Sequence, residues 1–172
     1  VQDKALQAGL YDALASAYVR LGDTDIALGY GQTAFVYWRS LRDHSGIGRA
    51  AYTLSAIYMH IAQLKDNKQF LSYSMSFLDI ARDELARTDD VWQYPLLAYE
   101  QASIYFQLEK FEEAASWYQQ SLSEAERMDS PHYTLIAQHG LGLSQSKLAQ
   151  FHSARSYLKL ALSRWEILKN SY

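Results

Sequence analysis

The sequence predicts an all-helical chain built from repeated helical hairpins, and three observations support this prediction. Apolar residues recur at spacings of three and four residues, which is the period of a helix with one buried face. Segments with strand-like alternation are missing, and only two prolines occur in 172 residues. One sequence pattern also occurs three times along the chain. The apolar positions of the first segment are Leu10, Leu14, Ala17, Tyr18 and Leu21.

The repeated pattern occupies residues 21–34 (LGDTDIALGYGQTA), 108–121 (LEKFEEAASWYQQS) and 148–161 (LAQFHSARSYLKLA). An alanine stands at the same place in each copy, and a small residue follows seven positions later. Small side chains at these offsets lie near one face of a helix and let a neighbouring helix approach closely. The aligned small residues are Ala27, Ala114 and Ala154, followed by Ala34, Ser121 and Ala161.

A fourth copy of the pattern fits between the first and second copies, because these two are separated by about twice the repeat length of roughly 40 residues. Its second helix is predicted over residues 69–86, after a turn at residues 65–67 that comes three or four residues late, so this repeat has a longer first helix or a longer turn. The matching positions of its first helix are Ala51, Leu54, Ser55 and Tyr58, which correspond to Tyr11, Leu14, Ala15 and Tyr18.

Each repeat therefore reads as helix, short turn and helix. Ser130 followed by Pro131 is typical of a helix start, and Pro95 places another start near Tyr94. Ser45-Gly46 is interpreted as the separator of the first two repeats. The predicted helices cover residues 3–21, 24–42, 47–64, 68–87, 94–108, 111–128, 131–148 and 151–169. They form repeats over 3–43, 46–88, 93–129 and 131–170 within a single domain, 1–172.

These positions resemble the tetratricopeptide repeat family, whose pattern has a large residue, Leu-Gly and Tyr in the first helix and Ala, an aromatic and Ala in the second. Gly31 and Gln145 depart from the pattern, and the usual closing proline is missing. The long repeat is similar to that of bacterial signalling and regulatory proteins and of kinesin light chains. The resemblance implies a right-handed α-α superhelix of eight helices. It assigns repeat packing to Leu14, Tyr18, Ala27, Ala34, Leu54, Tyr58, Tyr105, Ala114, Leu141, Gly142, Ala154 and Ala161.

The resemblance also implies a concave groove lined by the first helices, which would bind a protein or peptide. Aromatic residues there could grip an extended peptide, and Arg20, Arg49 and Lys147 could hold an acidic group. In the alternative interpretation, the aromatics pack against the neighbouring unit and the charges are only solvated. The implied groove residues are Asp12, Ser16, Arg20, Arg49, Tyr52, Met59, His60, Tyr99, Ser103, Phe106, Gln107, His139, Leu143 and Lys147.

Composition argues against several other classes. The net charge of −3 provides no basic surface for nucleic acid, and no apolar run is long enough to span a membrane. Cysteine is absent from the sequence, and the histidines lack the paired spacing of a zinc site. No nucleophile elbow or phosphate-binding loop occurs. We therefore expect no enzyme activity, cofactor or metal. The histidines are His44, His60, His132, His139 and His152.

The expected function is a non-catalytic protein- or peptide-binding module, the sensing or scaffolding part of a bacterial signalling or transcription-regulatory protein. Two alternatives stay open at this point. The last helix carries an apolar stripe, including Leu158, Leu162 and Trp165, through which the chain could form oligomers or contact a further domain. A small molecule could instead stack on aromatic groove residues. Because the chain begins at Val1, it is interpreted as a piece of a longer protein, with a cytoplasmic location expected and a periplasmic one left open.

Overall fold

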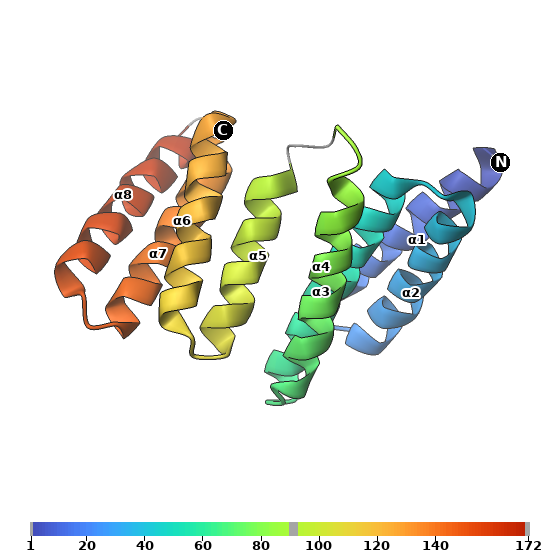
Figure 1. The fold of residues 1–172 in the computed structure, drawn as a ribbon, viewed down its shortest axis with the longest axis horizontal. Helices are drawn as coiled ribbons and strands as arrows, with labels where there is room; N and C mark the ends of the chain where they lie inside the picture. Colours follow the sequence, from blue (N-terminus) through green and yellow to red (C-terminus); the bar gives the residue numbers. More distant parts are fainter. Residues whose placement is uncertain (1, 90–92, 171–172) are drawn as a thin grey trace. The chain divides into compact units, whose positions relative to one another are not determined.

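The computed structural model describes residues 2–89 and 93–170, and in these ranges the chain forms eight α-helices and no strand (Figure 1). The predicted all-α class is confirmed. Each predicted helix is present, and all the observed ends except one lie within two residues of the predicted ends. The helices are α1 (Gln2–Leu21), α2 (Thr24–Leu41), α3 (His44–Leu64), α4 (Gln69–Leu85), α5 (Tyr94–Gln107), α6 (Phe111–Arg127), α7 (Pro131–Lys147) and α8 (Phe151–Lys169).

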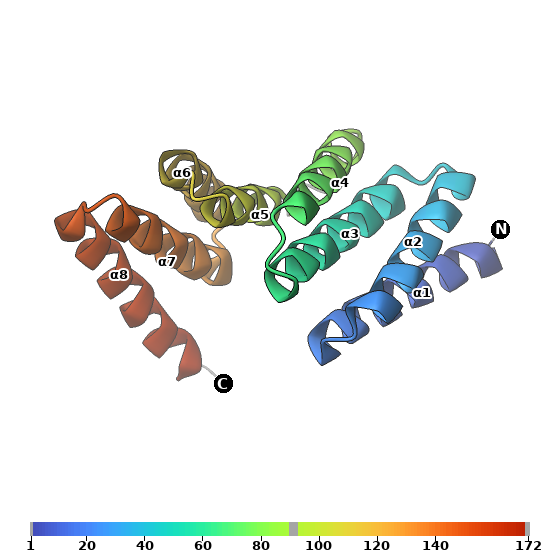
Figure 2. The same cartoon turned by 90° about the horizontal axis from the view of Figure 1, so that it is seen from below.

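The chain divides into two compact units, residues 1–91 and 92–172. The first unit contains the hairpins α1–α2 and α3–α4, and the second contains α5–α6 and α7–α8 (Figures 1 and 2). Within each unit, consecutive helices lie against each other. The prediction that residues 1–172 make a single domain stays a prediction.

The described turns inside each unit all end the preceding helix in the same way. One residue adopts a left-handed backbone, and the next N–H returns to a carbonyl five residues earlier, for example from Asp23 to Tyr18 at 3.0 Å and from Lys110 to Tyr105 at 3.0 Å. This arrangement is the Schellman motif, which satisfies the free carbonyls of a helix end. The left-handed residues are Gly22, Arg42, Asp66, Glu109, Asp129 and Ala149.

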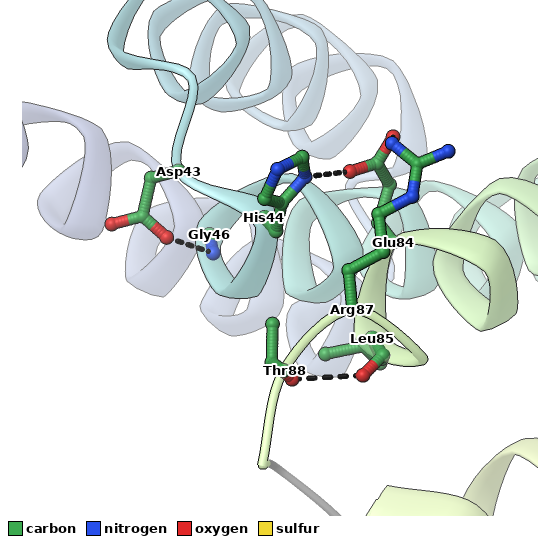
Figure 3. A network of polar contacts seen from close by, with 7 residues as sticks. All are labelled: Asp43, His44, Gly46, Glu84, Leu85, Arg87 and Thr88. Atoms are coloured by element: carbon green, nitrogen blue, oxygen red, sulfur yellow. Dashed lines mark hydrogen bonds and ion pairs between the residues drawn. The ribbon is translucent and has the colours of Figure 1, made fainter.

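The start of α3 differs from the sequence prediction. The helix begins at His44, because the side chain of Asp43 accepts a hydrogen bond of 2.8 Å from the N–H of Gly46 and so caps the first turn. Ser45-Gly46, predicted to separate two repeats, is therefore inside the helix, and that prediction was wrong. Figure 3 shows the same corner, where His44 Nδ1 lies 2.5 Å from Glu84 Oε2 and ties the start of α3 to the end of α4.

One part of the core of the first unit lies where α3 packs against α2. Trp38 of α2 is buried against Gly46 of α3, where a Cβ would lie only 2.3 Å from the indole ring. In the next turns the roles reverse, since Gly31 of α2 faces Leu54 and Ile57 of α3. This alternation of large and small residues allows a close helix crossing. The buried residues of the two clusters that include this crossing are Ala8, Ala15, Ala27, Ala34, Trp38, Ile47, Ala50, Leu54, Ile57 and Ile61.

The core of the second unit is centred on Tyr118 of α6, which packs against α7. The ring of Tyr118 lies directly over Gly140, and Leu158 of α8 lies over Gly142 in the same way. Ser121 donates a hydrogen bond of 2.7 Å to the backbone carbonyl of Pro95, which joins α6 to the start of α5. The buried core residues are Ala102, Ala114, Tyr118, Leu122, Ala137 and Leu141.

Candidate functional site

The candidate residues lie on the first helix of each hairpin, on α1 and α3 in the first unit and on α5 and α7 in the second. All fourteen residues assigned to the groove are at least partly exposed. Eight of the twelve residues assigned to repeat packing are instead buried. The eight buried residues are Ala27, Ala34, Leu54, Ala114, Leu141, Gly142, Ala154 and Ala161.

The other four packing residues are more accessible. Tyr18, Tyr58 and Tyr105 are half-buried, with their rings packed on the hairpin cores. Leu14 is 40 % exposed, whereas the adjacent Ala15 is fully buried. The corresponding Leu54 of α3 is fully buried and lies against Gly31 of α2, so Leu14 is more accessible than its counterpart in the second repeat.

In the first unit, the structure brings Asp12 of α1 close to Arg49 and Thr53 of α3. Burial raises the pKa of the Asp12 carboxyl above its ordinary value, and the Thr53 hydroxyl and the Arg49 charge oppose this rise only in part. One carboxylate oxygen of Asp12, Oδ1, is buried without a hydrogen-bond partner among the described residues. The Arg49 guanidinium also lies 5.6 Å from the ring centre of Trp38, where the aromatic face attracts its positive charge.

The remaining groove candidates of this unit form a mixed polar and apolar surface. Ser16 and Arg20 are exposed on α1, beside the apolar side chains of Ala13, Ala17 and Leu21. The half-buried candidates on α3 are Tyr52, Met59 and His60. Thr53, which the sequence interpretation did not include, stands one helical turn after Arg49, and that spacing was the available signal for it.

In the second unit, the aromatic candidates are engaged inside the unit. The ring of Tyr99 lies 5.4 Å from that of Tyr118, and Phe106 makes an edge contact of 5.3 Å with Phe111 across the turn. Ser103 donates a hydrogen bond of 3.0 Å to the Tyr99 carbonyl and is 3.2 Å from the Tyr118 hydroxyl. These contacts favour the alternative interpretation for Tyr99 and Phe106, in which the rings stabilise the fold.

Burial also affects the titration of this aromatic cluster. The pKa of Tyr118 is raised well above its ordinary value, mainly by burial, and its hydrogen bond with Ser103 compensates only in part. The pKa of Tyr99 is raised by burial and by the nearby charge of Glu100. Neither hydroxyl is therefore available as a general base at neutral pH.

The exposed candidates of the second unit are on α7. His139, Leu143 and Lys147 recur at four-residue spacing and share one side of the helix. Gln107, at the end of α5, is half-buried. In the second unit, these residues provide basic, polar and apolar side chains.

Within residues 2–89 and 93–170, no group of three or more His, Asp or Glu side chains is placed to hold a metal ion. None of the helices in the described part of the chain combines the length and apolar character needed to cross a bilayer.

Comparison with protein families identifies the second half of the chain: residues 94–167 match the model of the tetratricopeptide repeat family. Comparison with curated protein sequences gives no match. Among solved structures, BtubC (BKLC) from P. vanneervenii is similar with a TM-score of 0.77 and 18% identity. That likeness covers 100% of this chain and 68% of BtubC.

A second solved structure is a signal transduction ATPase with numerous domains from Pyrococcus horikoshii, which has a tetratricopeptide repeat sensor. It is similar with a TM-score of 0.72 and 20% identity, over 98% of this chain. The chain spans only 25% of that protein. At these identities the likeness shows the fold, and it confirms the predicted solenoid of helix-turn-helix repeats.

Proposed function

We propose, from the match of residues 94–167 to the tetratricopeptide repeat family, that the chain is a non-catalytic module that binds a protein or peptide on the exposed faces of its first helices. The main observation in support is the difference in exposure between two sets of residues. All fourteen groove residues are at least partly exposed, whereas most of the small residues at the hairpin crossings are buried. A surface that combines aromatic, apolar and charged side chains suits a peptide backbone with alternating side chains.

The first unit contributes the part of this surface with the clearest polar chemistry. Asp12 is an acceptor with an unused oxygen, and Arg49 provides a cation nearby. Partly buried groups of this kind give orientation and specificity to a bound peptide, since a hydrogen bond from the peptide would satisfy the Asp12 oxygen. Met59 and His60 add apolar and aromatic area on α3.

The biological setting follows from the same premise. We propose that the chain acts as the sensing or scaffolding part of a bacterial regulatory protein. The tetratricopeptide repeat sensor of the Pyrococcus horikoshii ATPase supports the sensing role by similarity of fold. The bacterial origin stays a prediction from the long repeat.

A random peptide library displayed on phage tests the binding function directly. Peptides enriched on the folded chain are synthesised, and their affinities are measured by calorimetry. We expect Met59→Ala combined with His60→Ala to weaken binding by about tenfold or more, the loss that truncating anchoring side chains typically causes.

The matched control changes two exposed residues on a second helix, Ser76→Ala combined with Asp83→Ala on α4, and should leave the affinity unchanged. If no peptide is enriched, or if the control weakens binding as much as the groove variant does, the proposal is overturned.

A further inference from the structure

The first unit contains an arginine that is held in place by an aromatic ring and has no acidic partner. Arg49 of α3 is exposed, and its guanidinium lies 5.6 Å from the ring centre of Trp38 on α2. Among the described residues, no carboxylate oxygen lies within 4.0 Å of an Arg49 side-chain nitrogen. The positive charge of Arg49 is therefore free to meet an anion from outside the chain.

The ring beside Arg49 is a fixed part of the core. Trp38 is only 6% exposed, and it lies against Gly46, one helical turn before Arg49. The face of an indole ring attracts a cation, and a guanidinium stacked on a ring keeps the N–H donors at its edge available. Because the ring cannot move away, less side-chain freedom is lost when Arg49 binds a ligand.

The other charges of this surface also favour an anion. The groove candidates of the first unit include two exposed arginines, Arg20 and Arg49, and a single carboxylate, that of Asp12. Asp12 is half-buried, its Oδ1 atom is buried, and burial raises its pKa, which disfavours its negative charge. The accessible charge of this surface is therefore positive, although the whole chain has a net charge of −3.

We propose that Arg49 binds an acidic side chain of the ligand, and that the partner of the first unit is therefore an acidic peptide. This rests on the proposed function of peptide binding and adds the chemical class of the peptide. A guanidinium can donate two parallel hydrogen bonds to one carboxylate, which gives both strength and orientation. Nucleic acid is a poorer match, because it requires a row of cations along the surface and this one has two arginines.

Calorimetry with matched pairs of peptides tests the proposal. Each peptide that the folded chain enriches from the phage library is synthesised twice, once unchanged and once with every Asp and Glu replaced by Asn and Gln. We expect the wild-type chain to bind the acidic form about tenfold more tightly, because a close charge pair is lost in the neutral form. Arg49→Gln should bind the two forms with nearly equal affinity.

The matched control is Arg39→Gln on α2. Arg39 is also exposed and also lies over an aromatic ring, with its guanidinium 5.7 Å from the ring centre of Phe35, but it is not a groove candidate. This variant should keep the preference of the wild type for the acidic form. Added salt should weaken binding of the acidic form and leave that of the neutral form almost unchanged. Circular dichroism verifies that both variants keep their helical content.

The outcomes separate this proposal from the proposed function. If the wild-type chain binds both forms of the enriched peptides equally well, peptide binding stands and the acidic partner is refuted. A preference for the acidic form that persists in Arg49→Gln, or that is lost equally in Arg39→Gln, also refutes the role of Arg49. If no peptide is enriched, the proposed function itself fails, and the acidic partner fails with it.

Discussion

Gly140 of α7 lies directly beneath the ring of Tyr118 of α6, so closely that a Cβ on Gly140 would be 2.4 Å from Tyr118 Cε1. The backbone of one hairpin is therefore in contact with an aromatic side chain of the hairpin before it. In the first unit the contact between α2 and α3 is made in the same way, by Trp38 over Gly46. A missing side chain on one helix and a large ring on the other set the distance between hairpins.

This contact predicts opposite effects for two glycine-to-alanine changes. Gly140→Ala should lower the free energy of unfolding by about 1–3 kcal/mol, because the added methyl group cannot be accommodated beneath the Tyr118 ring. Gly29→Ala should raise it by about 0.5–1 kcal/mol, because this exposed helical position has open space and alanine is the better helix former. Urea titrations followed by circular dichroism measure both. Equal effects of the two changes would contradict this account of the crossing.

The left-handed turn residues predict a second pair of effects. Ala149 has a φ of 57°, a conformation that is strained for any residue with a Cβ. Ala149→Gly should therefore stabilise the chain by up to about 1 kcal/mol, after allowing for the greater flexibility of glycine in the unfolded state. The equivalent turn of the first repeat provides the reverse test, since Gly22 has a φ of 85° and Gly22→Ala should destabilise by a similar amount. Thermal unfolding of both variants would show the opposite signs, and a destabilising Ala149→Gly would refute the argument.

Asp12 predicts a pH dependence of stability. Burial raises its pKa in the folded chain, so the folded state holds the carboxyl proton more tightly than the unfolded state does. Its contribution to stability is complete below the ordinary value of 3.8 and is lost as the pH rises through the folded pKa. Asp12→Asn should remove this loss, so the variant should gain stability relative to wild type as the pH rises from acidic to neutral. Chemical denaturation at a series of pH values checks this, and a constant difference between the two proteins would contradict it.

Tyr118 predicts an effect at alkaline pH. Its pKa is raised by burial, so above the ordinary value of 10.0 the unfolded chain ionises this hydroxyl and the folded chain does not. Stability should fall above that pH, and Tyr118→Phe should reduce the fall. Near neutral pH the same variant should cost about 0.5–1.5 kcal/mol, because the hydroxyl is hydrogen-bonded to Ser103. Tyrosinate absorbance during an alkaline titration reports the ionisation, and ordinary titration of every tyrosine in the folded chain would contradict the prediction.

The repeat positions of the second helices could be predicted because they depend on local spacing. Ala27, Ala114 and Ala154 are buried in the first turns of α2, α6 and α8, where close packing requires a small side chain in any hairpin of this type. The start of α3 could not be placed correctly from Ser45-Gly46. Its position depends on the Asp43 cap and is reinforced by Glu84, forty residues away in the sequence.

The sequence by itself determined the helical class, the four hairpins and the small residues at their crossings, since these follow from a period that is visible along the chain. Only the tertiary structure decided which side chains of the first helices remain accessible. Tyr99 has the periodicity of a groove residue, yet its ring is engaged by Tyr118 from another helix, whereas Leu14 has the periodicity of a core residue and is exposed. The burial of a side chain depends on which other helix packs against it. Helical periodicity shows which residues share one side of a helix, but it does not show which helix covers that side.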